Sequence, residues 1–174
     1  KFIRKAAGMG KASKLPDPDF YEHANDYCDV LVVGSGPAGT AAALEAAEKK
    51  LDVILAEQDH ILGGDQLSEV DYDHEKTKNL LEKSNIRVMT RTTAFGLYDN
   101  CVTGLIERVS DHHLGTRDNL PRQRFWTIRA KHIILSTGSL ERHIAFNNND
   151  TPGTMTAKSA SNYLNRYGVL SGQN

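Results

Sequence analysis

The chain has 174 residues, enough for one domain with appended segments and a core that buries roughly 70% of the unfolded surface. A hydrophobic fraction of 39%, a charged fraction of 25% and a net charge of -1 give no reason to expect nucleic-acid or membrane partners. No apolar run approaches the length of a transmembrane helix. The two cysteines, Cys28 and Cys101, form no CxxC or CxxxxC pair, which disfavours a dithiol-disulfide reductase and fits the reducing cytoplasm.

Residues 1–27 are predicted to form a basic N-terminal arm and a linker. Residues 1–14 contain no acid and five basic side chains, namely Lys1, Arg4, Lys5, Lys11 and Lys14. They lack the apolar core of a signal peptide. Pro16 and Pro18 then interrupt regular structure. We therefore expect a solvated or partner-docked arm, with the fold proper beginning near Cys28.

The segment 29–57 carries the most specific pattern in the chain. An apolar strand, 29–33, leads into the sequence Gly-Ser-Gly-Pro-Ala-Gly at residues 34–39. An Ala-rich helix is expected over 38–49 and a second strand over 52–57, which ends in a carboxylate. This order is typical of the dinucleotide-binding βαβ unit. Because the strand, helix and acid are all present, a purely structural glycine turn is the disfavoured interpretation.

Each glycine of the turn has a different expected role. Gly34 permits the tight turn, Gly36 lets the backbone approach a pyrophosphate, and Gly39 lets the helix pack closely on the sheet. The helix that begins near Ala38 directs free N–H groups and its positive end at the phosphates. Glu57, which lies 18 residues beyond Gly39, is placed to accept hydrogen bonds from ribose hydroxyls. Its charge disfavours the 2′-phosphate of NADP.

The middle of the chain predicts the rest of a sheet. The pair Gly63-Gly64 is expected where the backbone turns sharply or passes close to a ligand. A helix is predicted over 71–84 and a third parallel strand over 86–89. An antiparallel β-meander that covers one side of the sheet is predicted from three extended runs, 92–98, 101–110 and 124–129, with a turn at Asp99-Asn100 and a polar loop over 111–121.

The chain then returns through a buried-type strand, 132–136, which places Thr137-Gly138 at the carboxyl edge of the parallel sheet, where ligands bind. A helix is predicted over 155–167, with Gly168 as its C′ residue. The expected fold class is α/β, a Rossmann-like parallel sheet with helices and an antiparallel β-meander. Residues 28–146 would form the dinucleotide-binding domain, and 147–174 a connecting helix towards a missing second domain. The chain looks like a fragment of something longer.

This order of motifs resembles the two-dinucleotide-binding-domain flavoproteins, with Ser136-Thr137-Gly138 in place of the usual Ala-Thr-Gly. Four further segments are similar to the alpha subunits of heterotetrameric sarcosine oxidases, namely PDPDFYE at 16–22, TGSLER at 137–142, NDTPG at 149–153 and YLNRYG at 163–168. The resemblance runs along nearly the whole chain but covers only a fraction of such a subunit. Related subunits of opine oxidases, hydrogen cyanide synthase and a dye-linked proline dehydrogenase share much of the pattern and stay open as alternatives.

The resemblance implies an oxidoreductase complex that oxidises sarcosine to glycine, with hydrogen peroxide and 5,10-methylenetetrahydrofolate as products. It implies FAD in the beta subunit, FMN between alpha and beta, tetrahydrofolate on the C-terminal part of alpha, and gamma and delta subunits as further partners. In this region it implies a non-covalent NAD without an established redox turnover. In most relatives the first glycine motif binds FAD, so the residues alone leave NAD and FAD open.

Position by position, the resemblance places Ala38 at the pyrophosphate, Glu57 at the ribose, and Gln58 and Asp59 at the ribose or adenine edge. Asp65 and Gln66 would reach the rest of the cofactor, and the backbone of Ala94 the adenine. The complete set of candidate cofactor-binding residues is Gly34, Gly36, Pro37, Ala38, Gly39, Glu57, Gln58, Asp59, Gly64, Asp65, Gln66, Ala94, Thr137 and Gly138. Thr40 departs from the leucine usual in the family, which puts nothing essential in doubt.

No nucleophile-base pair and no metal site is predicted. His112-His113 lies in a polar loop without a partner at ligand spacing, so solvated side chains are the favoured interpretation. Phe125 and Trp126 are interpreted as sheet packing rather than a stacking platform. A second class of function stays open: a structural and interaction module that no longer binds a cofactor and docks through the basic arm and the helix at 155–167.

Overall fold

The computed structural model describes residues 2–172 except 9, 11, 13, 83, 84, 114 and 116–118. The strands are β1 (Tyr21–Val33), β2 (Val53–Ala56), β3 (Ile86–Met89), β4 (Thr92–Tyr98), β5 (Val102–Arg108) and β6 (Gln123–Leu135). The α-helices are α1 (Phe2–Ala6), α2 (Pro37–Glu48), α3 (His74–Glu82) and α4 (Ala157–Ser161), and the other helical turns are η1 (Gly64–Ser68), η2 (Asp99–Cys101) and η3 (Asn162–Arg166). The strands form one sheet in the order β3-β2-β1-β6-β5-β4. The predicted fold class is confirmed.

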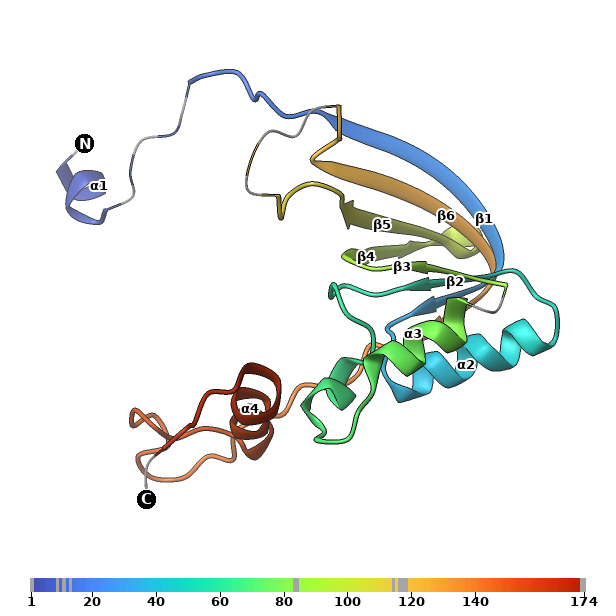
Figure 1. Ribbon diagram of the computed structural model, residues 1–174. Coiled ribbons are helices and arrows are strands. Elements are labelled where there is room, and N and C mark those ends of the chain that lie inside the picture. The colour runs from blue at the N-terminus through green and yellow to red at the C-terminus, as the bar shows by residue number, and fades with distance from the viewer. Residues whose placement is uncertain are drawn as a thin grey trace.

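The parallel part of the sheet packs against α2 and α3, which lie on the same side of it (Figure 1). β1 pairs with β2 from Val30↔Val53 onward, and β2 pairs with β3. Ala43 and Ala46 of α2 are buried against this face together with Leu81 of α3. Small side chains on α2 allow the helix axis to approach the sheet closely, and this brings the start of α2 to the end of β1.

β1 and β6 are longer than the sequence predicted. They pair in parallel from Tyr21↔Gln123 to Val33↔Leu135, so the runs expected at 124–129 and 132–136 are one continuous strand. Residues 21–27, predicted to be linker, form the first half of β1. They carry no buried apolar pattern, because that half of β1 is mostly exposed. Pairing with β6 stabilises it instead, aided by the ion pair between Glu22 and Arg124.

The meander is confirmed and stays part of the same sheet. β5 runs antiparallel to the first half of β6, and β4 joins β5 through η2, where Asn100 has a φ of 58°. Because β1 and β6 bend strongly (Figure 1), the meander curls over the face opposite α2 and α3. There Leu105 and Ile128 share a buried cluster with Leu31 and Ile54.

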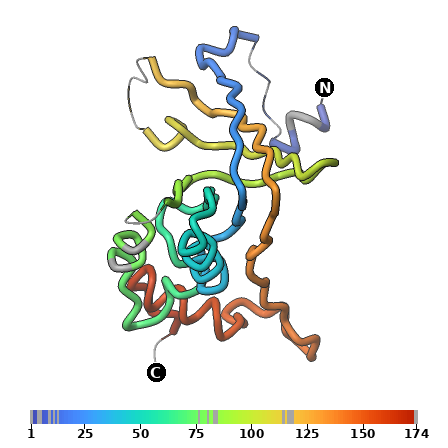
Figure 2. The backbone as a smooth tube through the Cα atoms, turned by 90° about the vertical axis from the view of Figure 1, so that its right-hand side faces the viewer, coloured from blue at the N-terminus to red at the C-terminus, as the bar shows by residue number. Residues whose placement is uncertain are grey.

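The C-terminal helical segment is α4 followed by η3, within the helix predicted over 155–167. Thr156 caps its start, where its side chain accepts a hydrogen bond from the N–H of Ser159. Gly168, with a φ of 65°, ends it and donates to the carbonyl of Leu164 over 3.0 Å. Figure 2 shows this segment beside the loop that contains η1. No described helix is both long and apolar enough to cross a membrane.

Candidate functional site

A cavity of about 540 Å³ opens at the carboxyl end of the parallel strands. Its walls come from the glycine turn, the ends of β2 and β6, and the start of β4. Most of the predicted site residues line it, namely Gly34, Gly36, Pro37, Ala38, Glu57, Gln58, Gly64, Asp65, Ala94, Thr137 and Gly138. Gly39, Asp59 and Gln66 are not among its lining residues. The fold therefore gathers distant parts of the candidate set around one hollow.

Packing explains two of the three glycines in the turn. Gly34 has a φ of 100°, and a Cβ there would lie 2.2 Å from the carbonyl oxygen of Ser136. A Cβ at Gly39 would lie 1.9 Å from the carbonyl oxygen of Gly34. A Cβ at Gly36 would meet no atom within 4 Å. The fold itself therefore requires Gly34 and Gly39, whereas the absent side chain of Gly36 leaves open the space in front of the turn.

The start of α2 gives this space a positive potential. Gly36 is the N-cap residue and Pro37 the first helical residue, and no side chain caps the helix. The first N–H groups of a helix lack intrahelical acceptors and carry the positive end of its dipole. No lysine or arginine is found among the described residues that line the cavity. Backbone groups alone supply the attraction for an anion, which fits a dinucleotide pyrophosphate.

Glu57 is buried and ties the cavity walls together. Its Oε2 accepts hydrogen bonds from the N–H and the hydroxyl of Ser35, over 2.9 Å and 2.6 Å, and its Oε1 accepts from the N–H of Asp59 over 2.8 Å. The hydroxyl of Ser35 also accepts from the N–H of Gly63 over 3.0 Å. The carboxylate lies on the cavity wall as predicted, and it also has a structural role that its spacing did not reveal.

Sequence reasoning missed Ser35, Thr92 and Ser136. Ser35 occupies a variable position of the glycine motif. Nothing in the sequence indicates that it hydrogen-bonds to Glu57, which lies 22 residues further along the chain. Thr92 begins β4 and is almost fully buried at the cavity. The carbonyl oxygen of Ser136 fills the space that a side chain at Gly34 would need. Contacts of this kind arise from tertiary packing and leave no local signal.

The backbone turns sharply at Gly63-Gly64, where both residues have positive φ, and lies close to the glycine turn. Gly64 has a φ of 55°, and a Cβ there would lie 3.2 Å from the Cα of Gly36. The loop after β2 thus lies against the glycine turn and closes one side of the cavity. Asp65, the next residue, lines the cavity and forms an ion pair with Lys158 of α4.

Asp59 and Gln66 contact protein rather than the cavity. Asp59 forms an ion pair with Arg166 and a hydrogen bond with His60, whose Nδ1 lies 2.7 Å from Oδ1 of Asp59. Burial acts to raise the pKa of Asp59, but Arg166 and the hydrogen bonds from His60 together hold it below its usual value. Gln66 lies in η1, where its carbonyl accepts from the N–H of Glu69 over 2.9 Å.

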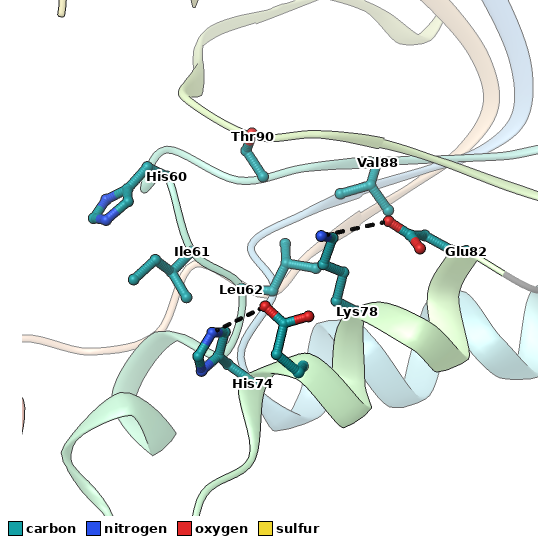
Figure 3. A pocket seen from close by; sticks show the side chains of 9 residues that line it. His60, Ile61, Leu62, His74, Lys78, Glu82, Val88 and Thr90 are labelled. Carbon is teal, nitrogen blue, oxygen red and sulfur yellow. Dashed lines mark ion pairs between the residues drawn. The ribbon is translucent and has the colours of Figure 1, made fainter.

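A second cavity, of about 430 Å³, lies between the loop at 60–62, α3 and β3 (Figure 3). Two ion pairs stand at its α3 side, His74 with Glu75 and Lys78 with Glu82. None of the candidate cofactor residues lines this cavity. No group of three or more His, Cys, Asp or Glu residues in the described part of the chain is arranged to hold a metal ion. The cavity at the glycine turn is therefore the candidate site.

Comparison with known proteins defines the class. The family model described as pyridine nucleotide-disulphide oxidoreductase matches residues 28–168. The chain belongs to this family.

The similarity to curated proteins is more specific. The chain is 43% identical to the sarcosine oxidase subunit alpha of Rhizobium meliloti (strain 1021) over 98% of its own length, and 38% identical to that of Corynebacterium sp. (strain U-96) over 95%. It spans 18% of the length of each. The crystal structure of L-proline dehydrogenase from P. horikoshii matches with a TM-score of 0.66 and 27% identity, over 87% of this chain and 31% of that one. The predicted resemblance is confirmed, and the alternatives are not better supported.

Proposed function

We propose that this chain is the NAD-binding region of a sarcosine oxidase alpha subunit. The observation that carries the proposal is the open space in front of Gly36, which faces the uncapped start of α2. The similarity to two sarcosine oxidase alpha subunits supports the choice of enzyme. The complete complex, with beta, gamma and delta subunits in the cytoplasm, would oxidise sarcosine to glycine and form hydrogen peroxide and 5,10-methylenetetrahydrofolate.

Within this region the residues bind and orient the dinucleotide. The backbone at Gly36 and Ala38 would hold the pyrophosphate, because the N–H groups at the start of α2 point towards it. Glu57 and Gln58 would contact the adenosine ribose, and the backbone near Ala94 the adenine. NAD supplies a hydride-accepting nicotinamide, but we assign no catalytic residue to this region. FAD, FMN and tetrahydrofolate would act elsewhere in the complex.

The position of Glu57 supports NAD over NADP. A carboxylate beside the ribose repels a 2′-phosphate, and the described cavity lining offers no cation to offset it. FAD shares the adenosine and pyrophosphate half of NAD and is therefore the alternative cofactor in this site.

The proposal is tested by identifying and titrating the cofactor. The purified chain is denatured and the released nucleotide identified by mass spectrometry, and the stripped chain is then titrated calorimetrically with NAD, NADP and FAD. We expect one NAD per chain and NADP affinity at least about tenfold weaker, in line with one like-charge repulsion between Glu57 and the 2′-phosphate. Tighter binding of FAD would reassign the site to the flavin. Failure to bind any of the three would contradict the proposal and favour the interaction module.

A further inference from the structure

The loop after β2, residues 58–69, is held by the C-terminal helical segment. The side-chain amide of Asn165 donates to the carbonyl of Ser68 over 2.7 Å, and Lys158 and Arg166 form ion pairs with Asp65 and Asp59. Both views place the segment beside this loop (Figures 1 and 2). One side of the loop forms the cavity wall at Gly64 and Asp65. The C-terminal segment therefore supports a wall of the candidate site from outside.

Asp59 connects this support to the glycine turn. Its carboxylate pairs with Arg166 and accepts from the N–H of His60 over 2.7 Å. Its own N–H donates to Glu57 over 2.8 Å, and Glu57 in turn accepts from Ser35. A continuous series of polar contacts thus leads from the guanidinium of Arg166 to the turn in front of α2.

The Arg166–Asp59 pair has the burial and the geometry to fix the loop. The side chains are 25% and 28% exposed, so solvent screens the pair less than a fully exposed one. The guanidinium also lies over the ring of Tyr167, 5.3 Å from its centroid, which restricts its orientation. Arg166 itself does not line the cavity. Its effect on a ligand would therefore be indirect, and its contact with Asp59 is the route by which it reaches the loop.

We propose that Arg166 is a positioning residue for the dinucleotide site, because its contact with Asp59 holds Glu57 and the loop wall where the cofactor needs them. The inference rests on the proposed function. Without the contact the loop would be less well ordered, so a bound nucleotide would leave sooner. The first encounter with the turn, which depends on α2 and Gly36, would change little.

The test compares NAD binding by the wild-type chain with binding by three variants, Arg166→Ala, Arg166→Lys and Arg87→Ala. Arg87 forms an ion pair with Asp26, also between two separate elements, and neither residue lines the cavity, so Arg87→Ala is the matched control. We expect Arg166→Ala to weaken NAD binding about 5- to 30-fold, the upper part of the range for an indirect coupling, mainly through faster dissociation in stopped-flow measurements. Arg166→Lys should recover part of the affinity, and Arg87→Ala should stay within about twofold.

A double-mutant cycle with Asp59→Asn distinguishes an effect of Arg166 that passes through Asp59 from a general loss of stability. If Arg166 acts through Asp59, adding Arg166→Ala to Asp59→Asn should cause little further loss of NAD affinity. Wild-type affinity in Arg166→Ala, or equal losses in Arg166→Ala and Arg87→Ala, would overturn the inference and leave the proposed function intact. A wild-type chain that binds no dinucleotide would overturn the proposed function itself.

Discussion

At the scale of single residues, the three glycines of the glycine turn have different reasons for lacking a side chain. Gly34 and Gly39 pack so closely against backbone and against Ser136, which follows β6, that a side chain at either position would collide with protein. Gly36 meets nothing, so its missing side chain matters only to a molecule that enters the cavity. Stability and binding can therefore be separated by substitutions a few residues apart.

Gly36→Ala should cost at most about 1 kcal/mol of unfolding free energy, since alanine is a poorer N-cap than glycine. It should weaken NAD binding at least about tenfold, because the new methyl group would occupy the space left for the pyrophosphate. Gly39→Ala should instead cost about 1–3 kcal/mol or more, through the backbone clash. Urea unfolding and calorimetric titration measure the two effects. Wild-type NAD affinity in a folded Gly36→Ala variant would exclude the proposed pyrophosphate site.

The two cysteines should differ in reactivity. Burial raises the pKa of the Cys28 thiol to about 11, and its side chain is inaccessible in the core, whereas Cys101 is exposed. The thiolate is the reactive form, so a disulfide reagent at pH 8 should modify Cys101 quickly and Cys28 only after denaturation. Counting released chromophore in the native chain and in Cys101→Ser checks this. Rapid modification of native Cys101→Ser would show that Cys28 is not protected.

Asp59 should make stability depend on pH in the acid range. Its pKa in the folded chain lies below the ordinary value of 3.8, so the ionised form stabilises the fold above that pH. This stabilisation is lost as the pH falls below about 4 and through the folded pKa. The stability difference between the wild type and Asp59→Asn should therefore shrink as the pH falls from 5 towards 3 in urea unfolding. A constant difference down to pH 3 would refute this role for the carboxylate.

At the scale of elements, β6 joins the two halves of the fold. Its first half pairs with both β1 and β5, and its second half delivers Ser136 and Thr137 to the glycine turn. The sequence predicted the βαβ unit, the meander and the end of this strand, because their apolar patterns and turn residues are local. It did not predict the polar half of β1 or the continuity of β6, since cross-strand pairing stabilises both.

Substitution of Ile128 tests how tightly the meander packs on the parallel strands at this junction. Ile128 is fully buried where the meander covers the parallel strands, together with Leu31 and Leu105. Ile128→Ala should lower the free energy of unfolding by about 2–5 kcal/mol, as expected for a cavity in a packed core. Leu97→Ala, in the exposed edge strand β4, should change it by no more than about 0.5 kcal/mol. Chemical denaturation compares the two, and a loss for Ile128→Ala no larger than for Leu97→Ala would contradict the packing of the meander on the sheet.

At the scale of the whole molecule, the site lies where five separate segments of the chain meet, at 33–38, 56–58, 64–65, 92–94 and 135–140. The sequence predicted the glycine turn, Glu57 and Thr137-Gly138, and all of these except Gly39 line the cavity. The roles of Ser35 and Arg166 were not predictable, because each depends on contacts across the fold that no local pattern records. The chain spans 18% of its sarcosine oxidase relatives, so the proposed turnover of sarcosine belongs to a larger assembly and the property to test here is binding.

The most direct test is an NMR titration of the 15N-labelled chain with NAD. Dinucleotide binding at the start of α2 predicts saturable amide shifts in the glycine turn, at residues 34–36, 38 and 39, with smaller changes near Glu57 and few at the far ends of β1 and β6. Unchanged turn amides at millimolar NAD, or saturable shifts confined to another surface, would contradict the assignment of this cavity as a dinucleotide site.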